Sequence, residues 1–103
     1  MRIRSLDQAF GSAYVFNTVI RLEANLGISR HRAATRGALR HCYLIEGRAR
    51  LGPESAAVTA KADDFVRFPA DTPHVFEAIT PIAVVFVCTT APQISATGGD
   101  RLF

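Results

Sequence analysis

The chain has 103 residues, of which 49% are hydrophobic and 20% are charged, and its formal net charge is +3. This length allows one hydrophobic core, so we expect a single domain over residues 1–103. Because no apolar run approaches the roughly 18 residues that span a bilayer, we expect no membrane contact. The first residues lack the apolar segment of a signal peptide and both cysteines lie in apolar strand patterns, so we expect a cytoplasmic protein.

Residues 14–24 form the first predicted strand. Alternation in their second half places Ile20 and Leu22 on one side, as expected of a half-buried strand. Gly27 follows the end of this strand. The basic stretch over residues 28–37 comes next and indicates a loop that passes over the mouth of a pocket.

A cluster of arginines lies in and just after this loop, at Arg30, Arg32, Arg36 and Arg40. Such a cluster can serve a nucleic acid, an anionic ligand or no partner at all. Nucleic-acid binding would normally show a reading helix or an exposed aromatic platform beside the basic residues, and the sequence contains neither. We therefore expect no direct nucleic-acid binding by this chain.

A hairpin is predicted from residues 39–45 and residues 48–51, with Gly47 supplying the turn. Alternation along the first of these strands places Arg40 and Cys42 inside and His41 outside. A slip of one residue would exchange the two faces. Under that alternative His41 would point inward, and Arg40 would pair with an acidic residue on the surface.

A second hairpin is predicted around a histidine. The strand over residues 65–68 ends at Pro69, which has no N–H for a sheet, and Pro73 closes a turn before His74. Alternation then directs His74 and Phe76 to one face. Two such hairpins facing each other would enclose a pocket.

The remaining strands are short, and turn signals recur between them. Residues 56–60 form one, and residues 82–89 are apolar on both faces, which indicates burial between the barrel and either a second sheet or another subunit. This spacing favours an all-β sandwich or barrel. Residues 91–100 are rich in small and polar residues, and we expect a flexible tail over residues 93–103. The outward apolar positions Tyr43 and Ile45 favour a homodimer.

Two stretches resemble the cupin family: FPADTPH at residues 68–74, and YLIEGRARLGP at residues 43–53. Pro69 and His74 match the Pro and His of the second cupin motif. In the second motif, Asp63, Asp71 and Ala78 replace the two Gly and the Asn. In the first motif, Gly27 and Gly47 match the two glycines. Its two His are replaced by Ala33 and Thr35, and its Glu is replaced by Arg40. The resemblance covers about residues 12–92 and implies a jelly-roll β-barrel with its core over these residues. The sequences of these two stretches are most similar to the cupin domains that follow a helix-turn-helix in XRE-type bacterial transcriptional regulators. The stretch before Phe10 is too short for a helix-turn-helix, so we expect this chain to be the sensing half of such a regulator alone.

The same resemblance bears on metal binding. A cupin metal site uses about three His nitrogens and a carboxylate, and only His74 is retained at its family position. His31 is the other candidate ligand, although a solvated loop residue is the favoured interpretation. Cys42 could act as a soft ligand or as a core side chain. A divalent metal at low occupancy therefore stays open as a cofactor, and no catalytic residue is assigned.

Arg40 carries the strongest functional inference. A guanidinium in place of a metal-binding carboxylate puts a positive charge where a cation would sit, and it would hold a carboxylate or phosphate instead. We expect an anionic small molecule bound by Arg40, His74, Phe76 and Cys42. A sensing or regulatory role is favoured over a metal-dependent enzyme of the dioxygenase or isomerase type. An oligomerisation module without a ligand is the third alternative.

Overall fold

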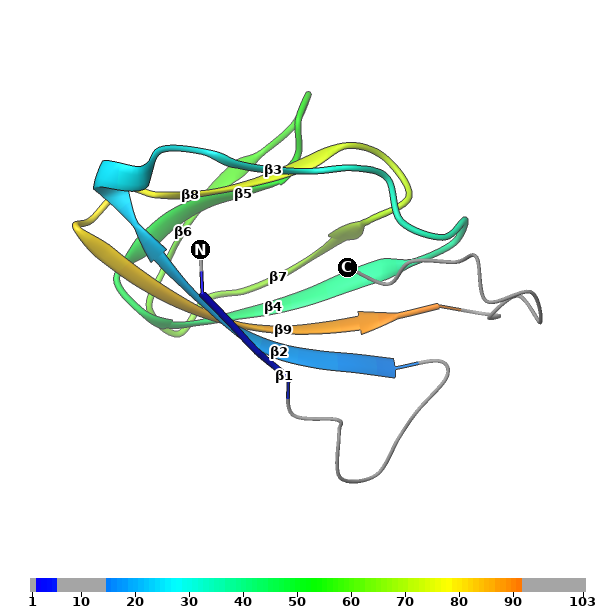
Figure 1. The fold of residues 1–103 in the computed structure, drawn as a ribbon, viewed down its shortest axis with the longest axis horizontal. Coiled ribbons are helices and arrows are strands. Elements are labelled where there is room, and N and C mark those ends of the chain that lie inside the picture. The colour runs from blue at the N-terminus through cyan, green and yellow to red at the C-terminus, as the bar shows by residue number, and fades with distance from the viewer. Residues whose placement is uncertain (1, 6–14, 92–103) are drawn as a thin grey trace.

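The computed structural model describes residues 2–5 and 15–91. Within these residues nine strands form two antiparallel sheets that face each other, which confirms the all-β jelly-roll expectation (Figure 1). The first sheet contains, in spatial order, β1 (Arg2–Ser5), β2 (Val15–Glu23), β9 (Ile82–Thr90), β4 (Leu39–Glu46) and β7 (Phe65–Pro69). The second contains β3 (Ser29–His31), β8 (His74–Ala78), β5 (Arg48–Pro53) and β6 (Val58–Lys61).

The core lies between the two sheets, because every second side chain of the central strands points inward. Ile20, Leu44 and Val85 of the first sheet are fully buried, as are Leu51 and Phe76 of the second. Each such side chain contributes about 1.5–3 kcal/mol through burial of apolar surface. The alternation predicted for β2 and β4 is therefore correct.

The two predicted hairpins are wrong. β4 and β5 lie in different sheets, and so do β7 and β8. Gly47 and the segment from Pro69 to Pro73 are corners at which the chain crosses from one sheet to the other. A hairpin and a corner both need turn residues, so the local pattern could not distinguish them. The strands that pair with β4 are β7 and β9, which are distant in sequence.

Element boundaries differ from the predicted ones in several places. A 3₁₀ turn, Ala24–Leu26, follows β2, and Gly27 then adopts a φ of 77°. The predicted loop over residues 28–37 is wrong for Ser29–His31, which pair with β8 as an edge strand. Three residues are too few to show a period in the sequence. The predicted strand 56–60 starts later, at Val58, and β1 was not predicted.

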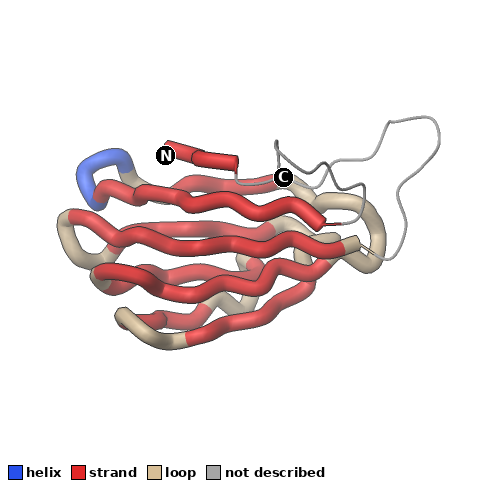
Figure 2. The backbone as a smooth tube through the Cα atoms, turned by 90° about the horizontal axis from the view of Figure 1, so that it is seen from below, coloured by secondary structure: helices blue, strands red, loops and turns tan. Residues whose placement is uncertain are grey.

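The outer face of the five-stranded sheet carries apolar side chains. Figure 2 views the molecule from the side of this sheet. In β9 the inward residues are buried and the outward ones are half-buried, so its second apolar face lies on the outside. We define the outer apolar patch as the exposed Tyr43, Ile45 and Phe65 with the half-buried Val84 and Phe86.

Two sequence predictions concern segments that the structure does not describe. The core boundaries at residues 12 and 92 and the flexible tail over 93–103 lie outside the described residues. Within residues 2–5 and 15–91, no helix has the length and hydropathy that crossing a bilayer requires.

Candidate functional site

Four strands bring polar side chains to one end of the sandwich. Arg40 lies near the start of β4 and pairs in register with Thr89 at the end of β9. In the other sheet His74 begins β8 and pairs in register with His31, which ends β3. The ends of these strands meet at the right of Figure 1, where the loops joining β3 to β4 and β7 to β8 also lie.

Arg40 is the centre of this cluster. Its side chain is fully buried, and it crosses the sandwich to the opposite sheet. Nε donates a hydrogen bond to His74 Nε2 at 2.8 Å, and Nη1 donates to Thr89 Oγ1 at 2.7 Å. The alternative in which Arg40 pairs with an acid on the surface is therefore wrong. His41 points to the outer face, where its Nε2 lies 3.1 Å from Thr90 Oγ1.

These contacts determine the protonation of His74. A guanidinium can only donate, so His74 Nε2 must accept and carries no proton. The ring proton then lies on Nδ1, which donates to the carbonyl oxygen of Thr72 at 2.8 Å. His74 is a neutral imidazole with both nitrogens engaged.

His31 lies beside His74. The two rings are nearly parallel, at an angle of 7° with centroids 5.4 Å apart, and the edge of the Phe76 ring meets His31 at 5.3 Å. His31 Nε2 is 3.2 Å from Ser29 Oγ, two residues earlier on the same face of β3. The interpretation of His31 as a solvated loop residue is wrong, because the pairing of β3 with β8 carries it to the site.

The site holds one positive charge at neutral pH. Burial lowers the pKa of Arg40 to about 10, which leaves the guanidinium protonated. Burial lowers the pKa of His31 to about 4, and electrostatic interactions with Arg40 and His74 act in the same direction. Burial also lowers the pKa of His74, although the hydrogen bond to Thr72 opposes this shift. Both imidazoles are therefore neutral at pH 7.

We expect the protein to lose stability as the pH falls from about 6.5 to about 4. His31 has an ordinary pKa of 6.5 when unfolded and about 4 when folded, so the unfolded chain binds the proton first. The contribution is complete above pH 6.5 and is lost as the pH falls toward 4. Melting temperatures measured by circular dichroism over this range should fall less steeply for His31→Gln than for the wild type. Equal slopes would contradict the shift.

The walls of the site are apolar. Phe68 and Phe76 are buried, and their rings lie 5.7 Å and 6.3 Å from the His74 ring. Cys42 is fully buried in the hydrophobic core, two residues beyond Arg40 on the inner face of β4. Burial raises the pKa of its thiol to about 12, against an opposing effect of Arg40. The thiol is therefore protonated and packs as a small apolar group.

Metal ligation is poorly supported by this geometry. Among the described residues, no group of three or more His, Cys, Asp or Glu side chains is placed to hold a metal ion. His74 Nε2, the atom that would face a metal, accepts the hydrogen bond from Arg40. The family positions Ala33 and Thr35 fall in the loop that joins β3 to β4. A metal bound by His74 and His31 would require Arg40 to move away.

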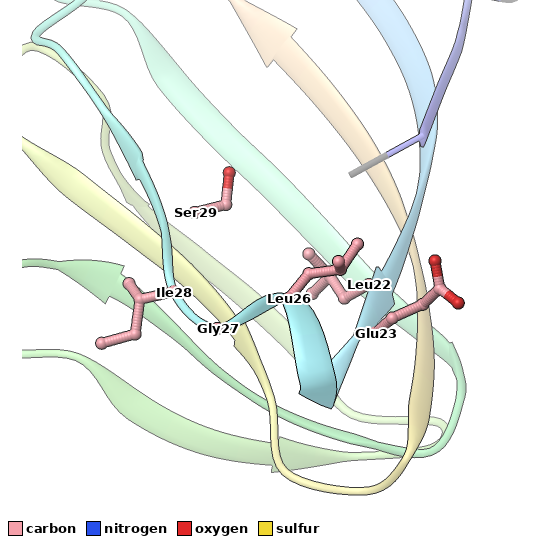
Figure 3. Close-up of a pocket in the computed structure, with 6 residues that line it drawn as sticks. All are labelled: Leu22, Glu23, Leu26, Gly27, Ile28 and Ser29. Atoms are coloured by element: carbon pink, nitrogen blue, oxygen red, sulfur yellow. The ribbon is translucent and has the colours of Figure 1, made fainter.

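Two surface hollows lie toward the other end of the sandwich. One has a volume of about 170 Å³ and is lined by Leu22, Glu23, Leu26, Gly27, Ile28 and Ser29 (Figure 3). The other has a volume of about 270 Å³ and is lined by Arg48, Thr59, Ala60, Lys61 and Asp64. One lining residue of the first hollow, Ser29, contacts His31 of the Arg40 cluster.

Sequence reasoning missed three groups that shape the site. Thr89 accepts from Arg40, the carbonyl of Thr72 orients His74, and Ser29 contacts His31. Alternation along β9 was a usable signal for Thr89, because it shares the inward parity of Val85 and Val87. Its neighbour across the sheet depends on a pairing between strands far apart in sequence.

No protein-family model and no curated protein matches the sequence. Solved structures do match. The Cupin_2 domain of an XRE-family transcriptional regulator from Enterobacter cloacae superposes with a TM-score of 0.77 at 19% identity, covering 89% of this chain and 97% of that one. The chain has the cupin fold.

Two further solved structures match. An HTH_3-family transcriptional regulator from Vibrio cholerae matches with a TM-score of 0.78 at 18% identity, over 88% of this chain and 51% of the regulator. A cupin-2 domain-containing protein from Shewanella frigidimarina gives 0.63 at 13% identity, over 87% of this chain and 80% of that one. The cupin resemblance is confirmed for the fold. The chain spans about half the length of the Vibrio regulator.

Proposed function

We propose that this cupin is a small-molecule-binding domain with a sensing or regulatory role, and that its ligand is an anion held by Arg40. The observation that carries the proposal is the guanidinium of Arg40, fully buried inside the barrel between His74 and Thr89. A cation in a low-dielectric interior attracts an anion more strongly than it would in water. The neutral imidazoles of His31 and His74 leave Arg40 as the charge that selects the ligand.

The present partners of Arg40 can be exchanged for a ligand. Nε and Nη1 donate to His74 Nε2 and Thr89 Oγ1, which are neutral acceptors. A carboxylate or phosphate oxygen accepts a stronger, charge-assisted hydrogen bond and can engage two guanidinium nitrogens at once. In the proposed complex His74 is a second donor, through a ring flip or a change of tautomer. Phe76 forms the apolar wall, and Cys42 closes the floor.

A regulatory role has support from the similar structures. One is a transcriptional regulator, and another is the cupin domain of such a regulator. Under this proposal the chain works in the cytoplasm, senses a metabolite and does not contact nucleic acid itself. Screening of organic acids by thermal shift tests the proposal, with the Arg40 variants described in the Discussion.

Metal content separates the sensor from the metal-dependent enzyme. We expect protein purified without a histidine tag to contain well under one metal ion per chain, because Arg40 occupies His74 Nε2. Inductively coupled plasma mass spectrometry measures this directly. One metal ion per chain that disappears in His74→Ala would favour the enzyme, with His31 as the second ligand.

We also propose a homodimer formed through the outer apolar patch. Phe65 and Ile45 are 62% and 48% exposed, which is unfavourable for large apolar side chains unless another surface covers them. Light scattering should return the mass of a dimer, and Phe65→Asp should shift it toward the monomer. Ile79→Asp is the matched control, since Ile79 is 50% exposed but follows β8 of the other sheet. A monomer mass for the wild type at high concentration would exclude the dimer.

A further inference from the structure

A loop covers the end of the sandwich where Arg40 lies, and Arg40 is not accessible to solvent in this structure. The loop over residues 32–38, between β3 and β4, is joined to the loop between β7 and β8 by two backbone hydrogen bonds of 2.8 Å. Ala34 N donates to Ala70 O, and Ala70 N donates to Ala38 O. Gly37 N also donates to Asp71 Oδ2 at 2.9 Å. Ala38 and Ala70 are fully buried in a small apolar cluster of their own. The loop is therefore an ordered cover at the end of the barrel where Arg40 lies.

The cover carries positive charge. Arg32 and Arg36 belong to it, and both are exposed. Two nearby acidic residues have their own contacts: Glu54 pairs with Arg30 at 3.3 Å, and Asp71 accepts a hydrogen bond from the backbone of Gly37. Residues 30–40 contain four arginines, counting the buried Arg40, and no acidic residue.

This arrangement bears on the number of charges that a ligand should carry. A ligand with one anionic group would satisfy Arg40 and leave the charges on the cover unchanged. A second anionic group would be attracted by the positive charges of Arg32 and Arg36 on the cover. Gly37, with a φ of 82°, lies in the cover six residues after His31, the last residue of β3, and gives the backbone a point of adjustment.

We propose that the ligand is a small dianion of the dicarboxylate or phosphorylated-acid class, with one anionic group on Arg40 and the other on Arg32 and Arg36. The inference rests on the proposed anion site and adds the charge of its ligand. Because the outer group binds at an exposed position, its contribution is screened by salt and smaller than that of Arg40.

Butyrate and succinate are suitable probes, since they have the same chain length and differ by one carboxylate. Isothermal titration at low ionic strength should show that succinate binds the wild type about three- to tenfold more tightly than butyrate. In Arg32→Gln/Arg36→Gln this ratio should fall to about one. The matched control is Arg48→Gln/Lys61→Gln, which removes the same charge beside the 270 Å³ hollow away from the cover and should retain the ratio.

The outcomes separate the two proposals. Equal affinities of the wild type for the two acids, or a ratio that survives in Arg32→Gln/Arg36→Gln, would overturn the dianion inference. Binding of butyrate that depends on Arg40 would leave the anion site standing in either case. If neither acid nor inorganic phosphate binds the wild type, the anion site and the dianion inference both fail.

Discussion

Arg40→Ala is expected to weaken the binding of organic anions by roughly ten- to a hundredfold. A charge-assisted hydrogen-bonded contact contributes about 1.5–3 kcal/mol, and each 1.4 kcal/mol corresponds to a factor of ten in affinity. The effect is large because the guanidinium is fully buried, where solvent screens it little. Thermal-shift screening of organic acids and sugar phosphates identifies the ligands, and isothermal titration measures the affinities.

Two control variants separate charge from packing. Arg40→Lys keeps the charge and loses the planar fork, so its affinity should fall between those of the wild type and Arg40→Ala. Thr89→Val removes the acceptor of Nη1 while retaining the guanidinium, and it should affect affinity much less. An acid that stabilises the wild type and Arg40→Ala equally would show that Arg40 does not touch the ligand.

Gly47→Ala should be among the most destabilising substitutions of a small residue. Gly47 has a φ of 78° at the corner between β4 and β5, and a Cβ there would collide with the carbonyl oxygen of Ile82 and with Thr80 Oγ1. A left-handed backbone costs about 1–2 kcal/mol for a residue with a side chain, and overpacking adds about 1–3 kcal/mol. We expect a total loss of about 2–5 kcal/mol, since the backbone oxygen of Ile82 cannot rotate away.

Gly27→Ala is the control for the backbone term alone. Gly27 has a φ of 77°, and a Cβ there would meet no atom within 4 Å. Chemical denaturation should therefore show a smaller loss for Gly27→Ala, about 1–3 kcal/mol. If the two variants lose the same free energy of unfolding, the close approach of Gly47 to Ile82 is not what requires glycine at position 47.

Several features of this protein follow from local sequence alone. The direction of Arg40 and Cys42 into the barrel and of His41 away from it was predictable, because the side-chain period of a strand is two and one face must be buried. Turn residues such as Gly47 and Pro73 marked the ends of strands correctly. The sequence motif around Pro69 and His74 indicated the cupin fold.

Other features were decided only by the tertiary structure. Whether Gly47 closes a hairpin or a corner depends on which distant strands supply the hydrogen bonds of β4, and these are β7 and β9. His31 reaches the site because a strand of three residues pairs with β8, and so short a strand has no period to read. Thr89 meets Arg40 through a pairing between residues 49 positions apart. The sequence by itself determined which side chains point inward, while long-range pairing decided which of them meet, because cross-strand neighbours are set by the register of the whole sheet.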